Sequence, residues 1–188
     1  MRLSAILLLS IGCLGGCASP AKHSGIDPEK STLLFPNGNY VHRVKLNIPA
    51  NPDPSKRKFE FRGAVKIAPD TIRIVVLSPV GTTLFKMTED RATGKLTVEN
   101  YVSQLKPYES RLADYYASLR ILLTTARHPT GAGYRLDDHG RPASLETAVD
   151  GRPTKFAFAD YDEHQIPTEL RVESATFQVD VKVIGYEL

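Results

Sequence analysis

The chain has 188 residues, of which 41% are hydrophobic, and this suits one folded domain with a substantial core. Its net charge of +3 is slight and it has no dense basic stretch, so the sequence does not favour nucleic-acid binding. Both cysteines, Cys13 and Cys17, lie in the N-terminal leader, which excludes a disulfide or a cysteine-based metal site in the rest of the chain.

The first residues are typical of a secretory signal. Arg2 provides a positive charge and residues 3–11 form an apolar run that is too short for a stable transmembrane helix. The ending LGGC at residues 14–17 resembles the lipobox of bacterial lipoproteins, which implies cleavage before Cys17 and acylation of that cysteine. An ordinary signal peptide is the alternative, and Cys13 is a weaker acylation candidate because no leucine stands three positions before it.

We therefore expect three parts: a signal peptide over residues 1–16, an acylated cysteine with a flexible tether over 17–29, and a folded domain over 30–188. The tether is expected because ASPAKHSGIDPE is small, polar and interrupted by proline and glycine. Several acyl chains make a durable membrane anchor, since each buried CH₂ contributes about 0.8 kcal/mol. Ala18 after the cysteine resembles the sorting signal of outer-membrane lipoproteins, which implies an outer-membrane location facing the periplasm.

Most of the domain has the period-two alternation of half-buried β-strands. In residues 59–67, for example, Phe59, Phe61 and Val65 alternate with other residue types. Residues 74–77 are apolar at every position, which predicts a strand covered on both faces. The patterns predict about ten antiparallel strands, including 44–48, 59–67, 72–78, 82–88, 95–99, 145–149, 155–159, 168–173 and 177–183.

Residues 78–81, Ser-Pro-Val-Gly, connect two of these strands. Serine at the first position, proline at the second and glycine at the fourth suit a type I turn. Val80 is an aliphatic residue that the turn does not require, at a position where side chains normally face water. The turn is either an ordinary connection or a loop whose tip contacts an apolar partner.

One segment, 110–129, has the period of a helix instead. Ser110 is a candidate N-cap, Arg127 and His128 fall in the last turn, and Pro129 ends the helix. We predict one amphipathic helix of roughly five turns. Its apolar stripe consists of Leu112, Tyr115/Tyr116, Leu119, Leu122/Leu123 and Ala126.

These elements predict a mainly β (α+β) fold. A twisted antiparallel sheet of this size tends to curl, and one helix with an apolar stripe can fill the concavity. We expect a curled antiparallel sheet that forms an unclosed β-barrel, with the helix as a lid over an apolar cavity. A β-sandwich is the competing fold. The candidate cavity and lid residues are Phe59, Phe61, Ile74, Val76, Phe85, Leu112, Tyr116, Leu119 and Leu123.

No catalytic arrangement is visible in the sequence. The motifs GxSxG and GxxxxGK[ST] are absent. The acidic residues at 160–163 and the DDHG at 137–140 are expected to form solvated turns. We expect no enzyme, metal or cofactor, and a hydrolase with a cryptic site is the enzymatic alternative. The histidines lack metal-ligand spacing and are expected to be solvated: His23, His42, His128, His139 and His164.

Four stretches resemble LolB, the outer-membrane receptor for lipoproteins, and they occur in the same order along the chain. They are IRIVVLSPVGTTLFKM at 72–87, ASLRILLTTARHP at 117–129, GYRLDDHGRPASLE at 133–146 and IPTELRVESATFQVDVKV at 166–183. The resemblance covers most of residues 40–188. Small LolB-like lipoproteins of unassigned role, some associated with export of envelope lipids, are at least as similar.

The resemblance implies an unclosed barrel with a helical lid. It also implies that the protein receives acylated cargo from a LolA-like periplasmic carrier and delivers it to the outer membrane. In LolB a leucine at the tip of a Pro-Leu-Gly turn protrudes and is needed for membrane insertion. The matching residues are Pro79, Val80 and Gly81, with valine in place of leucine. We expect a monomer that binds lipid or acyl chains. Export of another envelope lipid and a protein-binding scaffold are the alternative functions.

Overall fold

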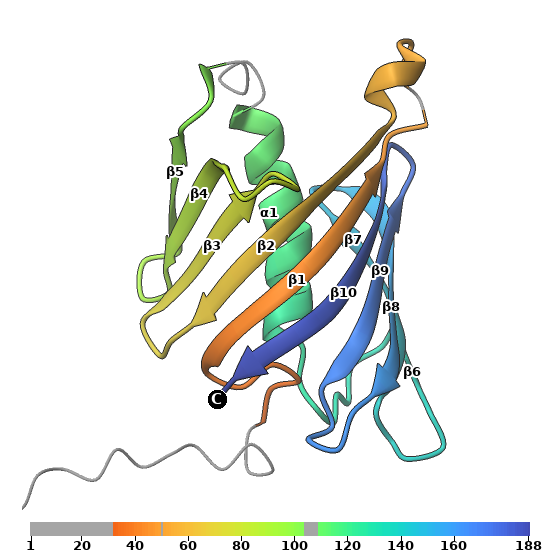
Figure 1. The fold of residues 1–188 in the computed structure, drawn as a ribbon. Helices are drawn as coiled ribbons and strands as arrows, with labels where there is room; N and C mark the ends of the chain where they lie inside the picture. The colour runs from red at the N-terminus through yellow and green to blue at the C-terminus, as the bar shows by residue number, and fades with distance from the viewer. Residues whose placement is uncertain (1–31, 50, 104–108) are drawn as a thin grey trace, which may run out of the picture.

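The computed structural model describes residues 32–49, 51–103 and 109–188; the expected signal peptide, Cys17 and the tether lie outside them. These residues form one sheet of ten antiparallel strands and one α-helix, α1 (Glu109–Thr124) (Figure 1). The strands are β1 (Gly38–Asn47), β2 (Lys58–Ile67), β3 (Thr71–Leu77), β4 (Thr83–Asp90), β5 (Lys95–Asn100), β6 (Tyr134–Leu136), β7 (Pro142–Val149), β8 (Arg152–Tyr161), β9 (Pro167–Ser174) and β10 (Gln178–Glu187).

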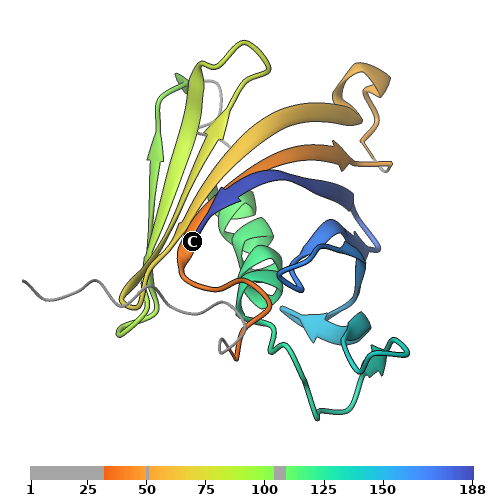
Figure 2. The same cartoon turned by 60° about the horizontal axis from the view of Figure 1, so that its bottom comes forward.

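The strand order is β5-β4-β3-β2-β1-β10-β9-β8-β7-β6. Neighbours in the sheet are neighbours in the chain, except where β1 pairs with β10 and so joins the two ends of the domain. The edge strands β5 and β6 do not pair with each other, so the sheet stays open. In Figures 1 and 2 the sheet curls around α1. The prediction of a mainly β fold with an unclosed antiparallel sheet is confirmed, and the β-sandwich is excluded for the described residues.

Strand β3 corrects one expectation from the sequence. Its apolar run predicted burial on both faces, but only Ile72, Ile74 and Val76 are buried. Val75 is half-buried and Arg73 is exposed, so the strand alternates like its neighbours. The physical reason is that the core fills only the concave side of a single curled sheet, and the convex side keeps contact with water.

Several elements differ in extent from those predicted. Strand β1 begins at Gly38 rather than at residue 44, which brings Tyr40 and His42 into the buried face. The proline-rich break after β1 contains a short 3₁₀ helix, η2 (Pro54–Lys56), whose N-cap Asp53 accepts a hydrogen bond from the Ser55 N–H. The short edge strand β6 was not predicted, because three residues are too few to display an alternation.

The helix is shorter than predicted. It starts at Glu109, so Ser110 lies inside it, and it ends at Thr124, so Arg127 and His128 lie beyond its last turn. The hydroxyl of Thr125 donates to the Ile121 carbonyl, and the Thr125 carbonyl accepts the Leu34 N–H at 2.9 Å. The chain after residue 124 therefore pairs with the segment that precedes β1 instead of continuing the helix.

One end of the concavity is closed by aromatic packing. Phe35 and Tyr40 are almost fully buried, with their rings edge to face at 5.5 Å. The Tyr40 hydroxyl donates to the Pro36 carbonyl at 2.7 Å, which satisfies its polar atom inside the core. Since β1 runs away from this packing, the opposite end of the sheet is where the concavity can open.

Candidate functional site: an apolar pocket between the sheet and the helix

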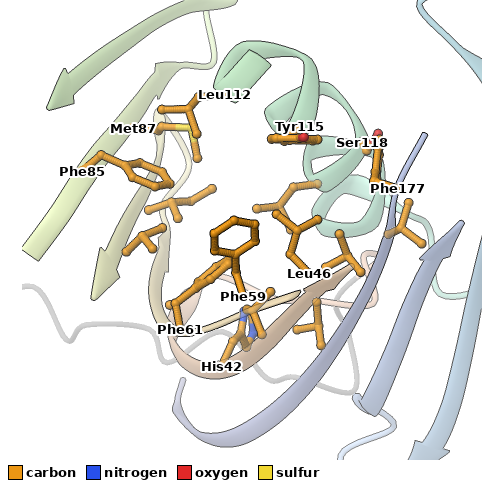
Figure 3. Close-up of a pocket in the computed structure, with 18 of the residues that line it drawn as sticks. His42, Leu46, Phe59, Phe61, Phe85, Met87, Leu112, Tyr115, Ser118 and Phe177 are labelled. Carbon is orange, nitrogen blue, oxygen red and sulfur yellow. The ribbon is translucent and has the colours of Figure 1, made fainter. Parts of the chain in front are cut away.

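A pocket of about 480 Å³ lies between the sheet and α1 (Figure 3). This volume falls within the range of roughly 300–1,000 Å³ that is typical of small-molecule sites. Figure 3 draws Phe59 and Phe61 on the sheet side and Leu112, Tyr115 and Ser118 on the helix side. The lining residues are His42, Val44, Leu46, Ile48, Asn51, Phe59, Phe61, Gly63, Val65, Ile74, Val76, Leu84, Phe85, Met87, Leu112, Tyr115, Ser118, Leu119, Leu122, Val172, Phe177, Val179 and Val181.

Most of the cavity residues predicted from the sequence line this pocket. They are Phe59, Phe61, Ile74, Val76, Phe85, Leu112 and Leu119. Tyr116 and Leu123 do not, and their helical neighbours Tyr115 and Leu122 line it instead. Successive side chains of an α-helix are rotated by about 100° about its axis, so the two members of an adjacent apolar pair face different directions. The sequence showed the apolar stripe, but it did not show which member of each adjacent pair faces the pocket.

Tyr116 serves a different contact, with a buried carboxylate on β4. Glu89 is 1% exposed, and the Tyr116 hydroxyl donates to its Oε2. Arg120, one turn further along the helix, donates from Nε to Glu89 Oε1 at 2.9 Å. Burial and the Glu89 carboxylate raise the pKa of Tyr116, so the hydroxyl remains protonated and keeps donating. This network fixes the position of α1 relative to β4.

The described part of the pocket wall carries no charge. Among the described lining residues there is no aspartate, glutamate, lysine or arginine, and the polar side chains are those of His42, Asn51, Tyr115 and Ser118. A charged group placed inside would lose its hydration without a counter-ion. The pocket is therefore suited to apolar and uncharged ligand groups.

His42 differs from the solvated histidine expected from the sequence. It is 2% exposed, and its Nε2 has no hydrogen-bond partner in the part of the chain that the structure describes. Burial lowers its pKa from 6.5 to about 4, so the imidazole is neutral at pH 7. A signal for this burial exists in the sequence: His42 lies two residues before Val44, in phase with the apolar positions of β1.

Burial increases steadily along the pocket. On β2, Phe59 is 42% exposed, Phe61 is half-buried and Val65 is 2% exposed. On β1, burial likewise increases from Leu46, which is half-buried, to His42. The mouth therefore lies where β1 ends and β2 begins, and His42 lies at the floor.

The turn at residues 78–81 is built as the sequence predicted. The Gly81 N–H donates to the Ser78 carbonyl at 2.9 Å, which is the bond expected of a β-turn. Gly81 has φ +89°, a conformation that favours glycine. Val80 is 87% exposed and takes no part in these bonds.

The acidic turns have structural roles. Asp162 Oδ1 accepts the N–H groups of His164 and Ile166, and its Oδ2 accepts the Tyr186 hydroxyl at 2.7 Å. Asp137 accepts hydrogen bonds from Arg141, whose guanidinium holds the pKa of that carboxyl at about 2. The described residues contain no group of three or more histidine, cysteine, aspartate or glutamate side chains that could hold a metal ion.

Fold and pocket together define a class of protein: one open antiparallel sheet that curls around a single described α-helix, with an apolar pocket between them. α1 is the only α-helix of the described residues, and it lacks the length and apolar character of a bilayer-spanning helix. No family model matches the chain, and no significant match was found among curated proteins.

Proposed function

We propose that this protein is a LolB-like, non-catalytic lipoprotein that binds lipid or acylated cargo in the apolar pocket and helps deliver it to the outer membrane. The observation that carries the proposal is the pocket of about 480 Å³, whose described lining residues carry no charge. An acyl chain placed there gains about 25 cal/mol for each Å² of apolar surface removed from water. Release follows when the membrane offers equal or better burial, so transfer needs no nucleotide or metal.

In this proposal α1 is the lid of the cavity. Leu112, Tyr115 and Leu119 contribute its apolar wall. The Glu89 carboxylate holds the helix through Tyr116 and Arg120, away from the pocket lining. A fixed lid keeps the cavity preformed, which reduces the cost of ordering side chains when a ligand binds.

Exposed apolar side chains surround the mouth and support contact with a membrane. Leu77 pairs with Arg62 near the start of β2, so the turn after β3 lies at the same end of the sheet as the mouth. Val80 is 87% exposed at this turn, and Phe59 is 42% exposed at the start of β2. Tyr101, 57% exposed, follows β5 at the same end, where its N–H donates to the Leu84 carbonyl. We infer that this rim inserts into the bilayer and lets an acyl chain pass without crossing water.

The proposed partners follow from the pocket and its rim. A LolA-like periplasmic carrier would deliver the cargo, and the acylated Cys17 would hold a monomer at the periplasmic face of the outer membrane. Export of another envelope lipid would use the same pocket and rim. A protein-binding scaffold is less well supported, because the lining side chains leave the pocket unfilled.

Uptake of a fluorescent fatty-acyl probe tests the proposal. The first described strand, β1, begins at Gly38, so a soluble form starting at residue 18 retains every described strand and α1. We expect saturable binding of one probe per protein, followed by transfer to vesicles of outer-membrane phospholipids. Absence of binding under all conditions contradicts the proposal. Binding without transfer keeps the ligand site and removes the delivery step.

A further inference from the structure

His42 places an unpartnered polar atom at the floor of an apolar pocket. Its Nε2 is buried, has no hydrogen-bond partner among the described residues, and belongs to a residue that lines the pocket. The neighbouring rings of Phe35 and Tyr40 lie 6.4 and 6.3 Å from the imidazole and present no hydrogen bond to Nε2. Buried polar groups in folded proteins are nearly always paired, so this nitrogen calls for a partner from outside the chain.

Strand β2 leaves room beside His42 for such a partner. Gly63 stands opposite His42 on β2 and lines the pocket without a side chain. A Cβ added at Gly63 would have only the His42 Cβ, at 3.8 Å, within 4 Å. On the other side, the pairing of β1 with β10 shifts register between Val41 and His42, a bulge of the kind that often lies beside functional sites.

The chemistry of the floor selects an uncharged group. The imidazole is neutral at pH 7 because burial holds its pKa near 4, so one ring nitrogen donates and the other accepts. None of the lining residues that the structure describes supplies a charge to pair with a carboxylate or phosphate. A hydroxyl both donates and accepts and fits either tautomer, and a carbonyl fits the tautomer that donates from Nε2.

We propose that the pocket binds an amphiphile with an uncharged hydroxyl or carbonyl group, and that this group forms a hydrogen bond with His42 Nε2 at the floor. The apolar body of the ligand then occupies the part of the pocket between Phe61 and α1. This inference rests on the proposed function and adds the chemical class of the ligand to it. A buried water molecule on Nε2 is the competing arrangement.

The test compares two probes that differ by one hydroxyl, decan-1-ol and decane. Each displaces the uncharged dye N-phenyl-1-naphthylamine from the soluble form starting at residue 18. The preference is the affinity for decan-1-ol divided by the affinity for decane. We expect this ratio to fall about tenfold in His42→Phe, which keeps a ring but has no nitrogen. His42→Gln, which retains hydrogen-bonding atoms, is expected to keep most of the preference.

A second readout uses the unmodified sequence. In a ¹⁵N spectrum of the histidine side chains, the His42 Nε2 signal is expected to shift when decan-1-ol binds and to stay in place with decane. This measurement decides the question if circular dichroism shows that His42→Phe does not fold.

The outcomes separate the two proposals. If both probes bind but the preference is the same in His42→Phe, or the Nε2 signal does not respond to the alcohol, the His42 contact is wrong and the proposed function stands. A water molecule on Nε2 would give that result. If neither probe nor dye binds, both proposals fail.

Discussion

A larger side chain at position 63 would partly fill the pocket, and its effects test whether the pocket is a ligand site or an incidental void. Gly63→Val places three carbon atoms beside His42, where the nearest obstacle to a new Cβ lies at 3.8 Å. Burying them contributes about 2 kcal/mol at about 0.8 kcal/mol per carbon, and replacing a glycine inside a strand adds about 0.5–1 kcal/mol. The melting temperature is therefore expected to rise by roughly 6–12 °C for a domain of this size.

The same substitution should weaken ligand binding. A ligand that loses burial of about three methylenes loses about 2 kcal/mol, or roughly 30-fold in affinity for the acyl probe. The assays are thermal unfolding followed by circular dichroism and titration with the fluorescent probe. Gly185→Val is the matched control, because Gly185 is an exposed strand glycine with open space around it and does not line the pocket. The reasoning fails if Gly63→Val destabilises the fold, or if it binds the probe as well as the control does.

Three further predictions follow from single side chains. Val80→Glu is expected to leave folding and probe uptake intact and to abolish transfer to vesicles, whereas Ala92→Glu, at an exposed turn at the opposite end of β4, should transfer normally. Equal transfer by both variants would show that the Val80 turn only connects two strands and has no role in transfer. Glu89→Gln removes the charge that holds α1 and is expected to cost about 1.5–3 kcal/mol in urea unfolding. The control Glu99→Gln removes an exposed ion pair and should change stability little. Similar losses of stability in the two variants would contradict the role of Glu89 in holding α1. His42 has a pKa of about 4 in the folded protein and about 6.5 in the unfolded chain, so the unfolded chain binds the proton more tightly. The neutral His42 therefore contributes up to about 3 kcal/mol to the free energy of unfolding above pH 6.5, and this contribution is lost as the pH falls to 4. The corresponding part of the pH dependence of stability should be missing in His42→Phe.

The strand pattern could be predicted from the sequence because a sheet with one buried face forces a period of two on its side chains. In β10, Val181 and Val183 are buried while Lys182 is exposed, as the alternation requires. The turn at 78–81 was equally predictable, since proline and glycine each match the backbone angles of one turn position. The existence of the helix followed from its three-to-four spacing.

Other features depend on contacts between distant segments. The apolar run in β3 did not indicate that the convex face of this strand would remain partly exposed. The residues near Thr124 likewise do not indicate that the chain leaves the helix and pairs with the residues around Leu34. Which of the adjacent residues Tyr115 and Tyr116 faces the pocket depends on where β4 places Glu89.

Sequence alone therefore determined the local elements of this protein: the strands, the turn with its exposed Val80 and one amphipathic helix. Only the tertiary structure decided that β1 pairs with β10, that one face of α1 lines a pocket, and that His42 lies at its floor. The physical reason is range. Periodicity and turn chemistry act between residues a few positions apart, whereas the pocket is the space left between surfaces that meet only when the whole sheet has curled around the helix.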